Sequence, residues 1–179
     1  MCNSDQGDTT AMERIWAPWR IQYILEGYKG ECLFCDVQRE NYEGKHFILE
    51  QKDNCLVMFN LFPYNNGHLM VAPQRHVSDL DCLTDEELLC TSRLVRKWTA
   101  ILKKEMKPEG FNIGLNIGKV AGAGFAGHLH YHIVPRWNGD TNFMPVTAGT
   151  KILSESLESC YDRLARALEQ YTEGGGGLK

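Results

Sequence analysis

The sequence lacks long apolar runs, an excess of basic residues and a leader-like start, and each absence argues against a class of protein. None of its apolar segments approaches the roughly 20 residues of a membrane-spanning helix, so we expect no membrane partner. The formal net charge of -4 provides no broad basic field, so we do not expect nucleic acid as a partner. The first five residues show no basic segment followed by an apolar one, which predicts a cytoplasmic protein without a secretion signal.

The cysteines also lack the spacing of a disulfide scaffold. There are seven, an odd number, and in a cytosolic chain such thiols are usually reduced. A length of 179 residues is sufficient for one domain with a sizeable core. We predict a single domain over residues 13–173, preceded by a flexible N-terminus (residues 1–12) and followed by a flexible glycine-rich tail (residues 174–179).

Apolar periodicity predicts an α+β fold. Short apolar or alternating segments between turn residues predict strands at residues 47–49, 55–59, 68–72 and 111–117. A helix is predicted from Thr84, which can form a capping box with Glu87, and a second helix is predicted over residues 154–171. The apolar stripe of the first helix comprises Leu88, Thr91, Val95, Trp98, Ile101 and Leu102. Hairpin-forming strands with two helices indicate an antiparallel sheet.

The most informative residues present are His128, His130 and His132, which occupy alternate positions. In an extended chain, alternate side chains point to one face, roughly 7 Å apart from i to i+2. The intervening Leu129 and Tyr131 then face a core. Imidazole can act near neutral pH as nucleophile, acid, base or metal ligand, so the pattern favours a functional strand over a histidine-rich surface strand.

A glycine-rich segment directly precedes the histidines. Four of the twelve residues from Asn116 to Gly127 are glycine. Glycine permits left-handed turns, and successive backbone N–H groups in such a turn can bind an anion. A plain flexible loop is the alternative interpretation. Together with the imidazoles, the segment suggests a phosphate held against a histidine nucleophile, which could form a covalent phosphoramidate.

These motifs together resemble the histidine-triad superfamily of nucleotide hydrolases and transferases. The resemblance covers about residues 45–140, and flanking motifs that resemble the bacterial diadenosine tetraphosphate phosphorylase branch extend it over nearly the whole chain. It rests on five segments: residues 16–24, 60–63, 67–73, 116–132 and 135–143. The resemblance implies a five-stranded antiparallel sheet with two helices, a homodimer, a nucleotide or dinucleoside polyphosphate as ligand, and no organic cofactor.

The resemblance also implies roles for the three histidines. His130 would attack the α-phosphorus of diadenosine tetraphosphate, the preferred substrate, and form a nucleotidyl-histidine intermediate. His132 would stabilise the developing charge on the same phosphate. His128 would orient the nucleophile or bind metal. Inorganic phosphate or water would accept the nucleotidyl group.

The resemblance assigns the substrate contacts to further residues: Asn60, His68, Asn116, Gly122, Ala123, Gly124 and Trp137. Asn60 would lie near the ribose, and Asn116 with the glycine turn would hold the phosphates. Trp137 would shape the entrance for the second nucleoside. His68 would support the site from behind or serve as a buried structural histidine. Related proteins often have Gln or Ser in the turn, whereas Ala123 and Gly124 offer only backbone, which leaves phosphorolysis and hydrolysis both open.

A structural zinc site is predicted at Cys32 and Cys35. A C-x-x-C pair can hold one tetrahedral Zn²⁺ with two further ligands. The resemblance supplies these as His76 and His128. A redox pair or two unrelated core thiols are the alternatives. Four protein ligands would leave no open position on the metal, so it would brace the fold.

Three other functions compete with nucleotidyl transfer from a dinucleotide. The same site could hydrolyse nucleoside phosphoramidates. The three histidines could instead bind a catalytic zinc, although no nearby Asp or Glu is evidently placed as general base. The pocket could also belong to a non-catalytic nucleotide sensor, because the turn lacks a polar side chain.

Overall fold

The computed structural model describes residues 31–39, 48–141 and 153–173. By its contacts the chain divides into two units, one of Tyr28–Thr141 with Leu153–Lys179 and one of Met1–Gly27 with Asn142–Ile152. Only the first contains described residues. The predicted flexible N-terminus, the motif at residues 16–24 and the glycine-rich tail lie outside the described residues. The single domain and the homodimer stay predictions.

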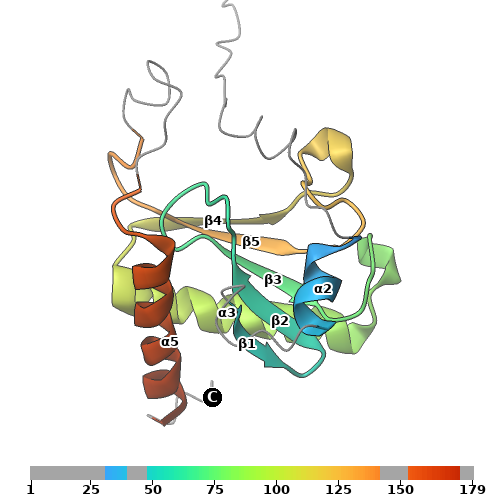
Figure 1. Ribbon diagram of the computed structural model, residues 1–179, viewed down its shortest axis with the longest axis horizontal. Helices are drawn as coiled ribbons and strands as arrows, with labels where there is room; N and C mark the ends of the chain where they lie inside the picture. The colour runs from blue at the N-terminus through green and yellow to red at the C-terminus, as the bar shows by residue number, and fades with distance from the viewer. Residues whose placement is uncertain (1–30, 40–47, 142–152, 174–179) are drawn as a thin grey trace, which may run out of the picture. The chain divides into compact units, whose positions relative to one another are not determined.

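Five antiparallel strands form one sheet in the order β1-β2-β3-β5-β4 (Figure 1). Their bounds are Ile48–Lys52 (β1), Cys55–Phe59 (β2), Leu69–Pro73 (β3), Gly110–Leu115 (β4) and Tyr131–Arg136 (β5). The predicted α+β fold with a five-stranded antiparallel sheet is confirmed. Strands β2 and β3 are buried along their whole length, which agrees with their continuous apolar sequence.

The two predicted helices are present. Helix α3 (Asp85–Met106) begins at the expected capping box, in which Thr84 and Glu87 each accept a hydrogen bond from the other's backbone N–H. Helix α5 (Leu157–Glu173) begins three residues later than predicted. The predicted apolar stripe of α3 wrongly included Leu88, which is 44% exposed. Leu94, which the prediction left out, is buried.

A third helix, α2 (Leu33–Arg39), was not predicted. Its seven residues are too few for a helical apolar period to stand out. Helix α2 covers one face of the sheet through Phe34 and Val37, while α3 and α5 cover the other around Trp98 and Leu164 (Figure 1). Within the described ranges, none of the helices has the length and apolar character that crossing a membrane requires.

The histidine run is only partly a strand. Strand β5 begins at Tyr131, so His132 lies within it, whereas His128 and His130 precede it. The prediction that all three share one strand was wrong, because the Leu129 N–H donates to the Val77 carbonyl, outside the β3–β5 pairing. Tyr131 and Ile133 do pack into the core on the α3 face, as expected from alternation.

Candidate active site

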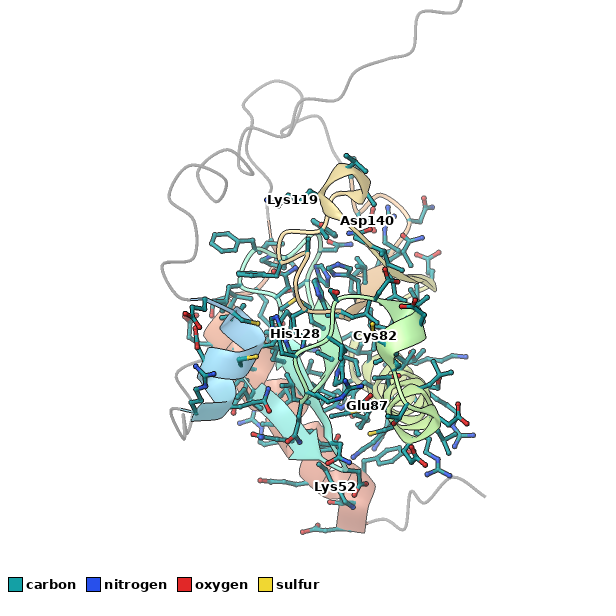
Figure 2. The ribbon with its side chains drawn as sticks, turned by 90° about the vertical axis from the view of Figure 1, so that its right-hand side faces the viewer. Lys52, Cys82, Glu87, Lys119, His128 and Asp140 are labelled. Atoms are coloured by element: carbon teal, nitrogen blue, oxygen red, sulfur yellow. The ribbon has the colours of Figure 1, made fainter. Side chains whose placement is uncertain are left out.

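The three histidines lie on the α2 face of the sheet and are largely buried. Their exposed fractions are 1% for His128, 4% for His130 and 8% for His132. Figure 2 shows His128 in the interior of the fold beside α2, whereas Lys119 lies at the outer edge of the fold. The rings of His130 and His132 lie nearly perpendicular, with centroids 4.8 Å apart. Two imidazoles therefore adjoin each other, and the third turns toward α2.

The imidazole of His130 has a defined hydrogen-bonding state. Its Nδ1 lies 2.8 Å from the carbonyl oxygen of His128, so the N–H of that nitrogen donates to this oxygen. The other ring nitrogen, Nε2, then carries a lone pair. Burial lowers the pKa of His130 below its usual value. Near neutral pH the ring is therefore uncharged, which is the state that a nucleophile requires.

A chain of hydrogen bonds sets the state of His132. The Tyr64 backbone N–H donates to Nδ1 of His68 over 3.0 Å, so this nitrogen is unprotonated. Nε2 of His68 must then carry the hydrogen of the neutral ring and donate it to Nδ1 of His132, 2.9 Å away. In neutral His132 the hydrogen is consequently on Nε2, which lies 3.4 Å from Nδ2 of Asn116. Both nitrogens then carry hydrogens, so they do not bond to each other and can share one acceptor. His132 thus presents a donor on the side where Asn116 lies.

Burial and the neighbouring His132 and His130 lower the pKa of His68 to about 3. His68 is fully buried and stays neutral throughout the physiological range. It contacts His132 directly. Its role in supporting the site stays a prediction.

The glycine turn supplies fewer free amides than expected. Residues Lys119–Ala121 form a short 3-10 turn, η2, flanked by Gly118 and Gly122 with positive φ values of 81° and 91°. The N–H groups of Gly122 and Ala123 donate to the carbonyls of Lys119 and Gly118. Of the three turn residues predicted to hold phosphate, Gly122 and Ala123 therefore already use their amides within the turn.

Two further predicted contact residues have their hydrogen-bond partners outside the run His128–His132. Asn60 accepts a hydrogen bond from the Phe62 N–H, and its amide nitrogen lies 3.4 Å from Nδ1 of His68. The indole N–H of Trp137 donates to the carbonyl of Met106 at the end of α3. Their roles at the ribose and at the entrance stay predictions.

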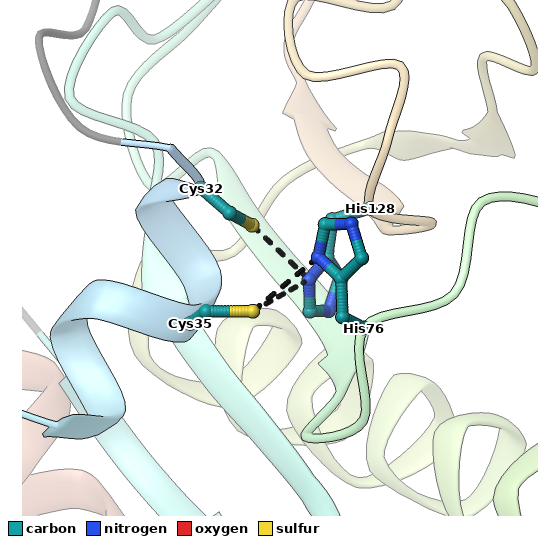
Figure 3. Close-up of side chains that lie close together, drawn as sticks. All are labelled: Cys32, Cys35, His76 and His128. Atoms are coloured by element: carbon teal, nitrogen blue, oxygen red, sulfur yellow. Dashed lines mark hydrogen bonds between the residues drawn. The ribbon is translucent and has the colours of Figure 1, made fainter.

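The predicted zinc ligands come together. Cys32, Cys35, His76 and His128 each offer one ligand atom, and these atoms all lie within 4.8 Å of one another. Figure 3 shows the four side chains pointing toward one another from α2 and the residue just before it, from the loop after β3 and from the segment before β5. The sulfur-to-Nδ1 distances are 3.3 Å for Cys32–His128, 3.3 Å for Cys35–His76 and 3.7 Å for Cys35–His128.

This geometry fits a tetrahedral zinc ion. Bonds of about 2.3 Å to sulfur and 2.0–2.1 Å to nitrogen place tetrahedral S and N ligands roughly 3.6 Å apart. Nε2 of His128 lies 2.9 Å from the Pro73 carbonyl, to which its N–H donates, leaving Nδ1 unprotonated toward the sulfurs. Burial lowers the pKa of His128 to about 4, so its ring is neutral and can ligate metal.

The alternative of three histidines on one catalytic metal finds no support in this geometry. Among the described residues, the four-residue set is the only group of three or more candidate ligands that converges on one point. His128 belongs to that set, while Nδ1 of His130 is directed to a carbonyl and Nδ1 of His132 to His68.

Sequence reasoning missed Phe34 and Tyr64. Phe34 is completely buried, and its ring lies against both His128 and His130. Tyr64 supplies the N–H that sets the state of His68, and its ring stacks on that imidazole at 4.7 Å. The position of Phe34 between two candidate metal ligands was a signal that could have drawn attention to it.

Known proteins resemble this chain over most of its length. A profile of the HIT domain matches residues 41–139. AP-4-A phosphorylase of Mycobacterium tuberculosis is 36% identical over 169 residues, which cover 89% of this chain and 86% of that protein. Adenosine 5'-monophosphoramidase hnt1 of Schizosaccharomyces pombe is 30% identical over 107 residues, covering 60% of this chain and 75% of that protein.

Solved structures share the fold. A Zn-bound histidine triad family protein from Mycobacterium smegmatis superposes with a TM-score of 0.66 at 24% identity, covering 80% of this chain and 97% of that one. The NitFhit protein of C. elegans superposes with a TM-score of 0.58 at 28% identity, covering 80% of this chain and 31% of that one.

Proposed function

This chain belongs to the HIT domain family, and from that premise we propose that it transfers nucleotidyl groups from dinucleoside polyphosphates. Diadenosine tetraphosphate is the preferred substrate, inorganic phosphate or water is the acceptor, and His130 carries the intermediate. The family and the phosphorylase relative support nucleotide hydrolase or transferase chemistry. The observation that carries the proposal is the buried, neutral His130, whose Nδ1–H is held by a backbone carbonyl and whose Nε2 has a lone pair.

In the first half-reaction Nε2 of His130 attacks the α-phosphorus. The bond from phosphorus to the bridging oxygen breaks, and the remaining nucleoside polyphosphate leaves with the bonding electrons. In the second half-reaction an oxygen of phosphate or water attacks the same phosphorus and breaks the P–N bond. Two displacements with lower activation barriers thereby replace a single displacement with a higher one.

His132 stabilises charge at the phosphorus. Its Nε2–H donates to a phosphate oxygen, because His68 holds its Nδ1 as an acceptor. Asn116 lies beside that nitrogen and orients the same oxygen. Since the Gly122 and Ala123 amides donate within the turn, we assign the remaining phosphate contact of this segment to the backbone of Gly124.

Cys32, Cys35, His76 and His128 would hold a structural zinc ion. When bound, the zinc supplies four bonds that join α2, the loop after β3 and the segment before β5. Two thiols and two imidazoles at tetrahedral spacing support this assignment, as does the Zn-bound histidine triad protein from Mycobacterium smegmatis.

The decisive experiment traps the intermediate. The protein is mixed with diadenosine tetraphosphate and quenched, and acid-labile nucleotide on the protein is measured by intact-mass spectrometry under basic and acidic conditions. We expect one nucleotidyl group per active chain in the wild type and none in His130→Ala, with turnover reduced by at least about 10³-fold. Tyr131→Phe, which alters the neighbouring residue on the opposite face, is the matched control. Turnover by His130→Ala at the wild-type rate would refute the proposal.

Product analysis identifies the acceptor. With inorganic phosphate present, ADP plus ATP indicates phosphorolysis, whereas AMP plus ATP indicates hydrolysis. The same assay with a nucleoside phosphoramidate tests the activity named for the Schizosaccharomyces pombe relative.

A non-catalytic nucleotide sensor is the second candidate. It is favoured by the turn before the histidines, which has no polar side chain at Ala123 or Gly124 and in which the Ala121, Gly122 and Ala123 amides donate internally. Calorimetric binding of AMP without turnover of any dinucleotide or phosphoramidate would identify this function.

A further inference from the structure

We propose that Phe34 is a positioning residue that holds the imidazole of His130 for attack and makes its orientation depend on the metal-ligand set. This proposal rests on the proposed function, in which His130 is the nucleophile. Phe34 lies in α2 between Cys32 and Cys35, and its side chain is completely buried.

The contacts of Phe34 link the two parts of the site. Its ring centroid lies 4.8 Å from that of His128, with 33° between the planes. It lies 4.9 Å from that of His130, with 35° between the planes. One aromatic ring therefore adjoins both a candidate metal ligand and the nucleophile, within the centroid range in which such pairs attract.

His130 is enclosed by partners that restrict its ring. Its Nδ1–H donates to the His128 carbonyl, Phe34 packs against the ring, and the His132 ring lies nearly perpendicular to it at 4.8 Å. The hydrogen bond alone still permits the ring to tilt about the N–H···O direction. The flat face of Phe34 limits that tilt and so fixes the direction of the Nε2 lone pair. Such control matters because a displacement of about 1 Å at a reacting group can cost about 100-fold in rate.

The position of Phe34 depends in turn on how α2 is held. A helix of seven residues has little stability of its own. Buried side chains such as Leu33 and Val37 attach α2 to the sheet, and the thiols of Cys32 and Cys35 attach it to His76 and His128. Loss of the metal would release the second attachment, and the Phe34 ring would lose its fixed place against His130.

The test compares Phe34→Leu with Val37→Ala. Phe34→Leu keeps an apolar side chain in α2 but removes the flat ring. Val37→Ala removes buried apolar volume from the same helix and is the matched control. We expect Phe34→Leu to lower the rate of nucleotidyl-histidine formation by about 10- to 100-fold. KM and zinc content per chain should stay at wild-type values in both variants, and Val37→Ala should keep the wild-type rate.

NMR of the protein without substrate distinguishes a positioning role of Phe34 from a role in substrate binding. In zinc-loaded protein with isotope-labelled histidine, His130 should give one set of ring NMR signals in wild type and Val37→Ala. It should give several sets, or broadened signals, in Phe34→Leu. Removal of zinc by a chelator should produce the same heterogeneity in the wild type and little further change in Phe34→Leu. A His130→Gln sample assigns the signals.

Two outcomes overturn the proposal. One is a single, unshifted set of His130 signals in Phe34→Leu with an unchanged rate of intermediate formation. The other is a raised KM with unchanged kcat, which would make Phe34 a substrate contact. If the wild type forms no nucleotidyl-histidine at all, the proposed function fails, while the NMR comparison still tests the positioning of His130 by Phe34.

Discussion

At the residue scale, the site is organised by which ring nitrogen carries a proton. The Tyr64 N–H determines the state of His68, and His68 determines that of His132. The carbonyl of His128 independently determines the state of His130. The two candidate catalytic imidazoles, His130 and His132, therefore differ at Nε2, which has a lone pair in one and an N–H in the other.

Burial of neutral His68 makes the stability of the protein depend on pH. Its pKa is about 3 in the folded chain against about 6.5 unfolded, so between these values the unfolded chain binds the proton more readily. The free energy of unfolding should therefore fall as the pH drops below about 6.5, by up to about 1.4 kcal/mol per pH unit for this group. Urea unfolding at pH 7.5, 6.5, 5.5 and 4.5 measures this slope.

His68→Gln is the comparison for that titration. The glutamine cannot gain a proton, so the variant should show a shallower loss of stability on acidification. His128, whose pKa is also lowered, is present in both proteins. Its contribution to the pH dependence of stability therefore cancels when the two slopes are subtracted. Equal slopes in the two proteins would contradict a neutral, buried His68.

At the element scale, the connection between β2 and β3 depends on Gly67. Gly67 has a φ of +70°, and a Cβ there would lie 2.5 Å from Sδ of Met106 at the end of α3. The flexible Met106 side chain can relieve part of this overlap, but the left-handed backbone remains unfavourable for alanine. We predict that Gly67→Ala lowers the free energy of unfolding by about 1–2 kcal/mol, measured by urea titration.

Gly114→Ala is the matched control. Gly114 pairs with His132 across β4 and β5, and a Cβ there would meet nothing within 4 Å. Its stability should lie within about 0.5 kcal/mol of the wild type. A loss at Gly114 as large as that at Gly67 would show that the conformation of Gly67 is not the cause.

The sequence predicted most elements because their signals are local. The capping box at Thr84 identified the start of α3, and continuous apolar residues identified β2 and β3. The candidate histidines and the four candidate metal ligands could likewise be selected from spacing and family resemblance. Helix α2 could not, because tertiary contacts through Phe34 and Val37 hold it and its own seven residues carry little periodic signal.

Hydrogen-bond partners far apart in the sequence were also beyond prediction. The bond from Leu129 to Val77 moves the start of β5 to Tyr131, and no local pattern signals it. The same holds for the internal use of the Gly122 and Ala123 amides, which depends on the exact path of the turn. The sequence thus identified the residues of the candidate site, whereas their protonation states depend on contacts that only the folded structure defines.

At the scale of the whole molecule, the candidate zinc site joins segments that the sheet alone does not hold together. We predict that Cys35→Ser loses most of the bound zinc and lowers the midpoint of thermal unfolding by about 10 °C, because metal binding to the folded state contributes to folding free energy. Zinc content by mass spectrometry and calorimetry measure both effects.

Cys82→Ser is the control for Cys35→Ser, because Cys82 is an exposed thiol outside the ligand set. It should keep wild-type zinc content and thermal midpoint. An unchanged midpoint in Cys35→Ser together with undiminished zinc would show that the four residues do not form the metal site.

The wide sequence separation of the ligands has a consequence for how the chain assembles. Cys32 and His128 contact each other across 96 positions, so this contact closes a long loop. Closing such a loop costs conformational entropy before any stabilising contact has formed. Long-range contacts of this kind therefore slow folding. During synthesis the C-x-x-C pair is made well before His128, so the four candidate ligands can come together only after residue 128 has been added.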